Sequence, residues 1–181
     1  AEDQDQGRDA GVDAHVVIPV SDPELLARMD AAVSVQRSMA RVAHLNTVVQ
    51  AIRKVNQLIV KERDRDRLLQ RACETLVEVR GFYSVWVALV KDGRPVEPFF
   101  CAGFDDEFEP MADALGSGRL PACARKALNR ENIFVTDNPP AECPECPLSG
   151  RYQGRAGLTM RLEHEGRVFG VLRASVPEGF A

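Results

Sequence analysis

The sequence lacks a long hydrophobic segment, and this absence limits where the protein can reside. No apolar run approaches the roughly 20 residues that a membrane-spanning helix needs. Residues 1–14 are acidic and lack the basic and apolar regions of a signal peptide. The chain begins with Ala and ends directly after a predicted strand, so we interpret it as a fragment. We expect a cytoplasmic location, with any membrane attachment in a part of the full-length protein outside this sequence.

An excess of positive charge is also missing. The 23 Lys and Arg residues, against 27 Asp and Glu residues, give a net charge of −4, and no basic cluster stands out. Because phosphate contacts dominate nucleic-acid binding, we expect no nucleic-acid partner. The 181 residues are 45% hydrophobic and 28% charged, a composition typical of a soluble globular domain with an appendage.

The motifs of common enzyme classes are absent as well. The sequence has no GxSxG segment, no P-loop and no HExxH segment. We interpret the acidic run at residues 104–109 as the start of a solvated helix rather than as an acid/base pair. We therefore expect the chain itself to be non-catalytic.

Glycine and proline are absent from residues 24–80, so a long helix is predicted over 22–80. Ser21 and Glu24 form a capping box at its start, because each side chain can bond the backbone N–H of the other residue. Charged residues replace apolar ones at 61–67, where we expect the helix to break. Residues 1–20 are interpreted as a flexible tail or the remnant of an upstream segment, and residues 21–62 as a separate helix.

Apolar residues within this helix recur at alternating steps of three and four, which is the spacing of a heptad repeat. The core positions of the repeat are Val42, Leu45, Val49, Ile52, Asn56 and Ile59. Val48 and Val55 widen the apolar face beyond a two-stranded seam. The pattern predicts a parallel coiled-coil dimer, and the alternative is an amphipathic helix packed on the core of its own domain.

After Gly81 the hydrophobic period changes from that of a helix to the alternation of β-strands. Strands are predicted at 84–91, 95–101, 133–136, 156–163 and 167–176, and short helices at 104–115 and 121–128. Asp92-Gly93 and the residues 164–166 predict hairpin turns. One antiparallel sheet with helices packed on it gives an α+β fold.

The five cysteines are odd in number, which argues against a disulfide scaffold. Cys143 and Cys146 form a CxxC segment in a proline-containing loop, and Cys123 lies in the first turn of a helix that Pro121 is expected to begin. We expect these three cysteines to come together, with Cys101 as a fourth candidate. Three interpretations stay open: a zinc or iron–sulfur site, a thiol–disulfide switch, or inert cysteines.

The order of elements resembles the GAF domain family, a relative of PAS domains, over residues 62–177. The segments that carry the resemblance are LLQRACETLVEVRGF, SVWVALV, FFCAGFDD and LTMRLEHEGRVFGVLRASVP. Gly170-Val171-Leu172 matches the glycine and two apolar residues typical of the family's last hairpin. Residues 63–181 are therefore expected to form a GAF domain without the family's C-terminal helix, which would follow Phe180.

The resemblance implies a sensory module of a histidine kinase or cyclase type of signal-transduction protein. The long helix is similar to the signalling helix of such proteins. The implied partners are a second copy of the chain, a small-molecule or redox signal, and an output kinase or cyclase domain. The implied ligand pocket lies on one face of the sheet and would be lined by Trp86, Ala88, Phe108, Met111, Thr159 and Arg161. Taken individually, each of these side chains is more often an ordinary core residue than a ligand contact.

The resemblance also allows an enzymatic alternative, because some proteins with this fold reduce free methionine sulfoxide through pocket cysteines. Cys123 would then be the nucleophile, and Cys143 or Cys146 would resolve the intermediate. The long signalling-type helix favours the sensory function over this alternative.

Overall fold

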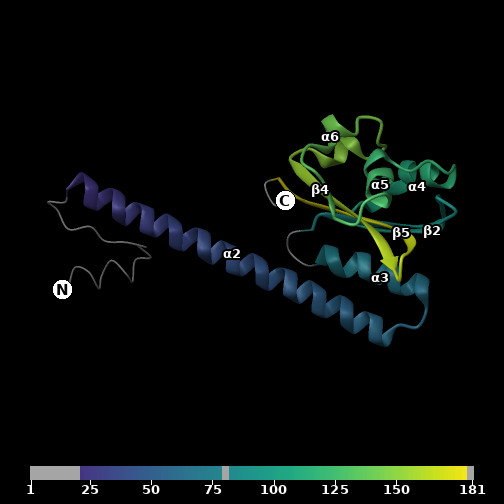
Figure 1. The fold of residues 1–181 in the computed structure, drawn as a ribbon, viewed down its shortest axis with the longest axis horizontal. Coiled ribbons are helices and arrows are strands. Elements are labelled where there is room, and N and C mark those ends of the chain that lie inside the picture. The colour runs from purple at the N-terminus through teal and green to yellow at the C-terminus, as the bar shows by residue number, and fades with distance from the viewer. Residues whose placement is uncertain (1–20, 79–81, 179–181) are drawn as a thin grey trace. The chain divides into compact units, whose positions relative to one another are not determined.

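The computed structural model describes residues 21–78 and 82–178. The chain divides into two units, residues 1–46 and 47–181, and the strands belong to the second unit (Figure 1). Helix α2, Asp22–Lys61, runs from the first unit into the second. Among the described residues, no helix combines the length and the apolar character that crossing a membrane requires.

The heptad positions of α2 are exposed on the single chain. The side chains of Val42, Val49, Ile52 and Ile59 are between 53% and 57% exposed, and Asn56 is exposed too. The side chain of Leu45, the remaining predicted position, lies outside the described part. Ala51 is only 3% exposed. The apolar stripe is therefore open to a partner, while another side of the same helix is buried.

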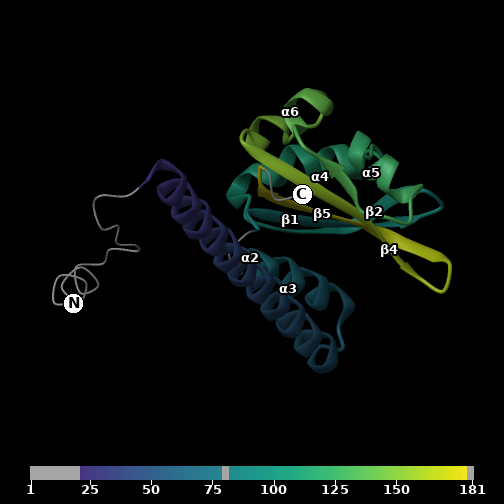
Figure 2. The same ribbon diagram turned by 60° about the vertical axis from the view of Figure 1, so that its left-hand side comes forward.

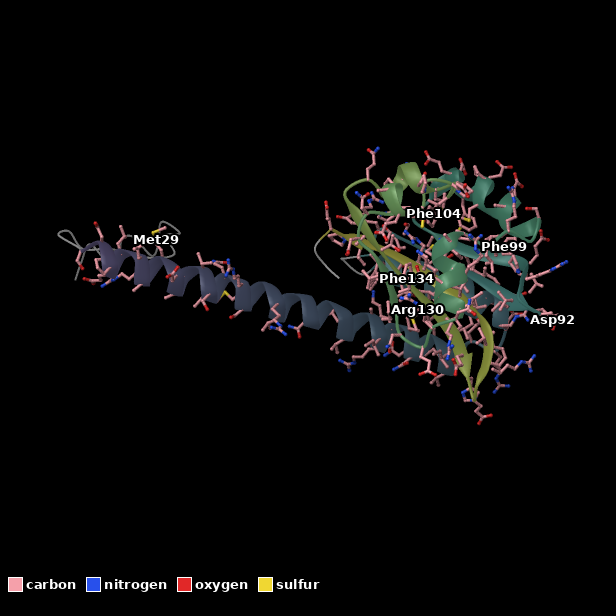
Figure 3. The ribbon with its side chains drawn as sticks, turned by 45° about the horizontal axis from the view of Figure 1, so that its top comes forward. Met29, Asp92, Phe99, Phe104, Arg130 and Phe134 are labelled. Atoms are coloured by element: carbon pink, nitrogen blue, oxygen red, sulfur yellow. The ribbon has the colours of Figure 1, made fainter. Side chains whose placement is uncertain are left out.

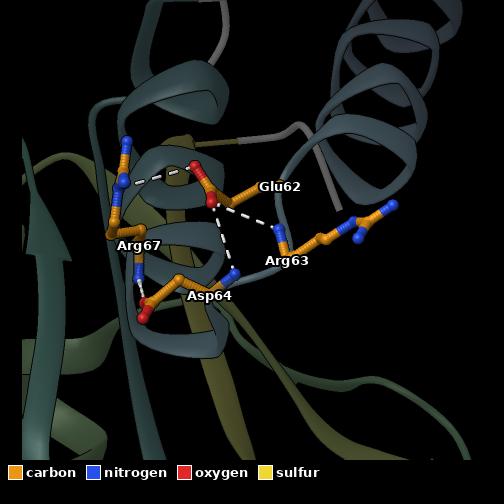
Figure 4. Close-up of polar contacts among 4 residues, drawn as sticks. All are labelled: Glu62, Arg63, Asp64 and Arg67. Atoms are coloured by element: carbon orange, nitrogen blue, oxygen red, sulfur yellow. Dashed lines mark hydrogen bonds and ion pairs between the residues drawn. The ribbon is translucent and has the colours of Figure 1, made fainter.

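The long helix breaks where charged residues were predicted to break it. Helix α3, Arg65–Glu78, follows a short connection in which carboxylates accept hydrogen bonds from backbone N–H groups (Figure 4). Asp64 accepts from the backbone of Arg67 at 2.8 Å, and Glu62 accepts from the backbone of Asp64 at 3.3 Å. These bonds satisfy amide donors at the start of α3 that have no partner within the helix.

Five strands form one antiparallel sheet in the order β2-β1-β5-β4-β3. Their bounds are Ser84–Lys91 for β1, Arg94–Ala102 for β2, Phe134–Thr136 for β3, Arg155–His164 for β4 and Arg167–Pro177 for β5. Pro95 and Pro98 lie in β2 at the sheet edge, where a missing backbone N–H is tolerated. Both residues of the Asp92-Gly93 turn have positive φ, as a two-residue hairpin requires.

Helices cover both faces of this sheet. In Figures 1 and 2, α3 lies on one face, and α4 to α6 lie on the other. The bounds on the second face are Asp105–Phe108 for the 3-10 helix η1, Glu109–Gly116 for α4, Ala122–Leu128 for α5, Pro139–Glu142 for α6 and Ser149–Tyr152 for the 3-10 helix η2. Arg130, after α5, lies with its Cζ atom 5.3 Å from the centre of the Phe134 ring on β3 (Figure 3). This architecture confirms the predicted α+β fold.

Two details differ from the sequence-based expectations. Pro121 is the N-cap of α5 rather than its first helical residue, because its ψ of 157° is extended. The loop predicted at 137–150 contains α6, which begins at Pro139 after the N-cap residue Asn138. An Asn cap followed by proline is a helix start signal, but at this length it could not be told from a turn.

Gly170 shows why the last hairpin carries a glycine. A Cβ atom at this position of β5 would lie 2.5 Å from the backbone oxygen of Ala88 on the neighbouring strand β1. We expect Gly170→Ala to lower the free energy of unfolding by about 1–3 kcal/mol, because a backbone strand must shift. Gly150→Ala is the matched control, since a Cβ there would meet no atom within 4 Å. Equal urea midpoints for the two variants would contradict this account.

Candidate functional site

Polar side chains line the face of the sheet that α4 to α6 cover. In one row across the strands, Trp86 of β1 pairs with Arg173 of β5, which pairs with Thr159 of β4. In the next row, Ser175 of β5 pairs with Gly157 of β4, and Gly157 pairs with Thr136 of β3. Paired residues, and residues two apart in a strand, point to the same face. These side chains therefore converge beneath the helices.

Within the described parts of the chain, seven buried side-chain polar atoms have no hydrogen-bond partner. All belong to this face or to the η2 residue above it: Trp86 Nε1, Thr136 Oγ1, Tyr152 Oη, Thr159 Oγ1, Arg173 Nε, Arg173 Nη1 and Ser175 Oγ. We call these six residues the polar floor. Buried polar groups are normally paired, so their concentration at one place marks a site rather than ordinary core.

Arg173 is the buried charge at the centre of the polar floor. Its side chain is 2% exposed, and its Cζ atom lies 4.4 Å from the centre of the Tyr152 ring. Gly157 makes room on the neighbouring strand, because a Cβ atom there would lie 2.5 Å from Nη2 of Arg173. The guanidinium group therefore packs against an aromatic ring, in space that a glycine leaves open. Among the described residues, no carboxylate forms an ion pair with it.

Two thiols lie beside this charge. Hydrogen bonding from Cys143 and the positive charge of Arg173 lower the pKa of Cys123 to about 6, although burial opposes the shift. The same contact with Cys123, together with burial, raises the pKa of Cys143. At neutral pH the pair therefore consists of a Cys123 thiolate and a Cys143 thiol, which is the arrangement of a reactive cysteine with a neighbouring donor.

A cavity of about 620 Å³ opens next to the cysteines. It lies between α4, the start of α5 and the loop after α6, and its lining includes Met111, Leu120, Arg125, Cys143 and Cys146. Cys143 also contacts Cys123, which lies against Arg173. The loop cysteines therefore stand between the cavity and the polar floor.

The predicted pocket residues divide between these regions. Trp86, Ala88, Phe108 and Met111 belong to one buried core cluster, and of the six predicted residues only Met111 also lines the cavity. Thr159 is fully buried in the polar floor. Arg161 lies further along β4 and forms ion pairs with Glu163 and Glu131 instead.

The four candidate cysteines do not form a metal centre. Within residues 21–78 and 82–178, no group of three His, Cys, Asp or Glu side chains could hold a metal ion. Cys101 lies on the edge strand β2, on the far side of β1 from Arg173, and burial raises the pKa of its thiol. Cys146 is close enough for the Cys123 thiolate to raise its pKa, but burial is the larger cause. The structure therefore brings Cys123 and Cys143 together and leaves Cys101 apart.

Sequence reasoning missed Arg173, Tyr152 and Gly157. Arg173 lies two residues after Val171 and two residues before Ser175 on β5. The alternation of the strand therefore places this charged side chain on the inward face. That conflict was the available signal, because an arginine is almost never fully buried without a partner. Tyr152 ends the short 3-10 helix η2, in a stretch of sequence without a periodic pattern, so no comparable signal existed for it.

An antiparallel sheet with helices on both faces and a buried site beneath one helical layer defines an α+β domain. The sequence model described as GAF domain matches residues 62–180, and the chain belongs to this family, whose fold is a ligand-binding regulatory one. No curated protein matches the chain.

Three solved structures show the same fold at low sequence identity. The GAF domain nlh2 of A. aeolicus, in an inactive state, has a TM-score of 0.56 and 12% identity over 72% of this chain and 80% of that one. A GAF domain of a Coxiella burnetii phosphoenolpyruvate-protein phosphotransferase has a TM-score of 0.55 and 16% identity, over 72% and 77%. Free methionine-R-sulfoxide reductase of Neisseria meningitidis, in complex with its substrate, has a TM-score of 0.51 and 18% identity, over 72% and 75%.

The lowered pKa of Cys123 predicts how the thiols of the protein titrate. Thiolate absorbance of the reduced protein should rise with a midpoint near pH 6, and Cys123→Ser should remove this step. Cys143→Ala should move the midpoint upward, because the thiolate loses its hydrogen-bond donor. Cys143→Ser is the matched control, since its hydroxyl group still donates and should move the midpoint less. A midpoint unchanged by Cys143→Ala would contradict the assigned hydrogen bond.

Proposed function

We propose that this chain is the sensory module of a signal-transduction protein of the histidine kinase or cyclase type. In this proposal the pair Cys123 and Cys143 is its redox-sensitive element, and the chain performs no catalysis. The supporting observation is the buried contact between the low-pKa thiol of Cys123 and the protonated thiol of Cys143, beside a cavity that Cys143 lines. A cysteine so placed reacts as the thiolate near neutral pH.

The redox step follows from ordinary thiol chemistry. The Cys123 thiolate attacks one oxygen of a hydroperoxide, the O–O bond breaks, and the products are a sulfenic acid and hydroxide, or alkoxide. The Cys143 sulfur then attacks the sulfenic sulfur, its proton leaves with the hydroxyl group as water, and a disulfide forms. A dithiol reductant reverses the change. The signal is thus reversible, as a sensor requires.

A disulfide changes the charge of the site as well as its covalent structure. Oxidation removes the negative charge that faces Arg173, and it ties the N-terminal turn of α5 to the loop after α6. In the full-length protein, we propose that this change is passed to the output domain through a dimer of α2 helices. Transmission requires only that the oxidised site favour one of two helix arrangements.

A peroxide reaction tests the redox element. Treatment of the reduced chain with hydrogen peroxide should yield a Cys123–Cys143 disulfide, identified by peptide mass mapping. Cys143→Ala should instead accumulate a sulfenic acid at Cys123 that dimedone traps, whereas Cys146→Ala should behave like the unmodified chain. A Cys123 that stays reduced while Cys101 or Cys146 is oxidised would contradict the proposal.

The thiol pair also supports a second candidate, reduction of free methionine sulfoxide. Cys123 would attack the sulfoxide sulfur, methionine would leave, and the resulting sulfenic acid would form the same disulfide with Cys143, releasing water. A dithiol reductant would complete the cycle. Sustained conversion of free methionine sulfoxide that depends on Cys123 would favour this enzyme over the sensory module.

The proposed dimer of α2 helices can be tested separately from the thiol pair. Ile52→Glu places a charge in the exposed apolar stripe of α2 and should convert a dimer to a monomer, with the circular dichroism of the folded domain retained. Gln50→Glu is the matched control, because it adds the same charge at an exposed position outside the heptad core. Sedimentation of the unmodified chain as a monomer at tens of micromolar, a concentration on the order of that needed for weak association, would refute the dimer.

A further inference from the structure

The polar floor has more hydrogen-bond donors than acceptors among the residues that the structure describes. The indole N–H of Trp86 and the guanidinium nitrogens of Arg173 can only donate hydrogen bonds. The hydroxyl groups of Tyr152, Thr159 and Ser175 can donate as well. All of these groups are buried. Tyr152 lies near Arg173 and Trp86, and Cys123 lies near Arg173 and Thr159, but none of the unpaired atoms has a partner in good hydrogen-bond geometry. A chemical group that accepts several hydrogen bonds at once would satisfy them together.

The charge of the floor limits this group to an anion. Arg173 is 2% exposed, and the charge that acts on it most strongly is the Cys123 thiolate. That thiolate is a single sulfur atom, and Nε and Nη1 of the guanidinium group are left without a partner. A buried cation whose donors are unpaired favours an oxyanion, since hydrogen bonds to charged groups are the strongest ones available.

The floor holds one cation, which the Cys123 thiolate balances while it is ionised, so an added ligand can bring at most one negative charge. A carboxylate carries a single charge and two acceptor oxygens, and arginine binds it with well-matched geometry. A phosphate carries more charge than Arg173 alone can balance. The neighbouring cavity of about 620 Å³ falls within the range for small-molecule sites. Cys143 lines it and contacts Cys123, so an acid bound there would reach the floor past the Cys143 side chain.

We propose that the polar floor binds the carboxylate group of a small organic acid, with Arg173 as the anchoring cation. Trp86, Tyr152 and Ser175 donate to the same group, and the body of the acid occupies the cavity beyond Cys143 and Cys146. This binding does not depend on disulfide formation, so it stands or falls separately from the redox proposal.

The Cys123 thiolate and the bound carboxylate compete for one positive charge. The titratable groups that face Arg173 are Cys123 from α5, Cys143 and Cys146 from the loop, and Tyr152 from η2. Burial raises the pKa of Tyr152 to about 12, and the pKa values of Cys143 and Cys146 are also raised. Only Cys123 is therefore ionised near neutral pH, and removing its charge should strengthen carboxylate binding.

The chain contains its own reporter for this binding. Trp86 is the single tryptophan in the sequence, and its indole N–H is one of the unpaired donors. The reduced, ¹⁵N-labelled chain should therefore give one indole resonance, and titration with sodium acetate should shift it with saturation. Sodium chloride at matched ionic strength should not produce a saturable shift of this resonance. Sodium phosphate is the third arm, and we expect it to bind at least roughly tenfold more weakly than acetate.

Four variants distinguish binding from a structural effect. Arg173→Met should abolish the saturable shift, and Cys123→Ser should strengthen acetate binding at neutral pH. Tyr152→Phe keeps the ring against Arg173 and should weaken binding roughly tenfold or more, the size expected for one hydrogen bond to a charged group. Arg155→Met is the matched control and should change nothing, because Arg155 also lies on a tyrosine ring, that of Tyr83, with its Cζ atom 4.2 Å from the ring centre.

Acetate affinity is expected to fall in Arg173→Met and to rise in Cys123→Ser. A variant that merely failed to fold would lose binding, so a gain of affinity in Cys123→Ser cannot come from misfolding. The proposal would be overturned if Arg173→Met bound acetate with the same affinity as the unmodified chain. It would also be overturned if neither the unmodified chain nor Cys123→Ser showed a saturable shift with acetate, and water would then be the partner of the floor. Phosphate binding tighter than acetate would overturn the assignment to a carboxylate.

Discussion

The site is organised around a positive charge that is buried without a carboxylate partner. Removing a charged group from water costs several kcal/mol, which is on the order of the net free energy of unfolding of a small domain. The neighbours of Arg173 are arranged to reduce this penalty. Tyr152 places its ring against the guanidinium group, Gly157 leaves space for it, and the Cys123 thiolate supplies the opposite charge.

In the two proposals made above, this arrangement would link charge, redox state and ligand occupancy at one place. The thiolate of Cys123 is stabilised by the hydrogen bond from Cys143 and then by the charge of Arg173, and Arg173 tolerates burial partly because the thiolate is near. Whatever neutralises the thiolate leaves the guanidinium group free for another anion. By linkage, a bound anion must then raise the pKa of Cys123. A redox signal and a small organic acid would therefore report to the output domain through the same buried charge.

The sequence predicted those parts of the fold that depend on local patterns. The break after Lys61, the Asp92-Gly93 turn and the alternating strands follow from capping residues, turn residues and hydrophobic period. The family assignment followed from the order of these elements and is confirmed by the match over residues 62–180.

The site was less predictable, because it depends on which residues meet across the sheet. The CxxC segment left a metal site, a thiol–disulfide switch and inert cysteines open. The structure gives the two cysteines different surroundings: Cys143 contacts Cys123, whereas Cys146 packs against the apolar cluster. Cys101 was a plausible fourth ligand only while the strand order was unknown. Arg173 could have been found as a charged residue within an apolar strand. Its contacts with Tyr152 and Gly157 are tertiary and leave no trace in the local pattern.

A crystal structure of the reduced chain, at a resolution that shows ordered water, tests the central claim most directly. The account predicts that Arg173 lies between the Tyr152 ring and Gly157, with Cys123 on one side and a bound acceptor against Nε and Nη1. A guanidinium group that turns to solvent, or that pairs with a carboxylate side chain of the same chain, would contradict it.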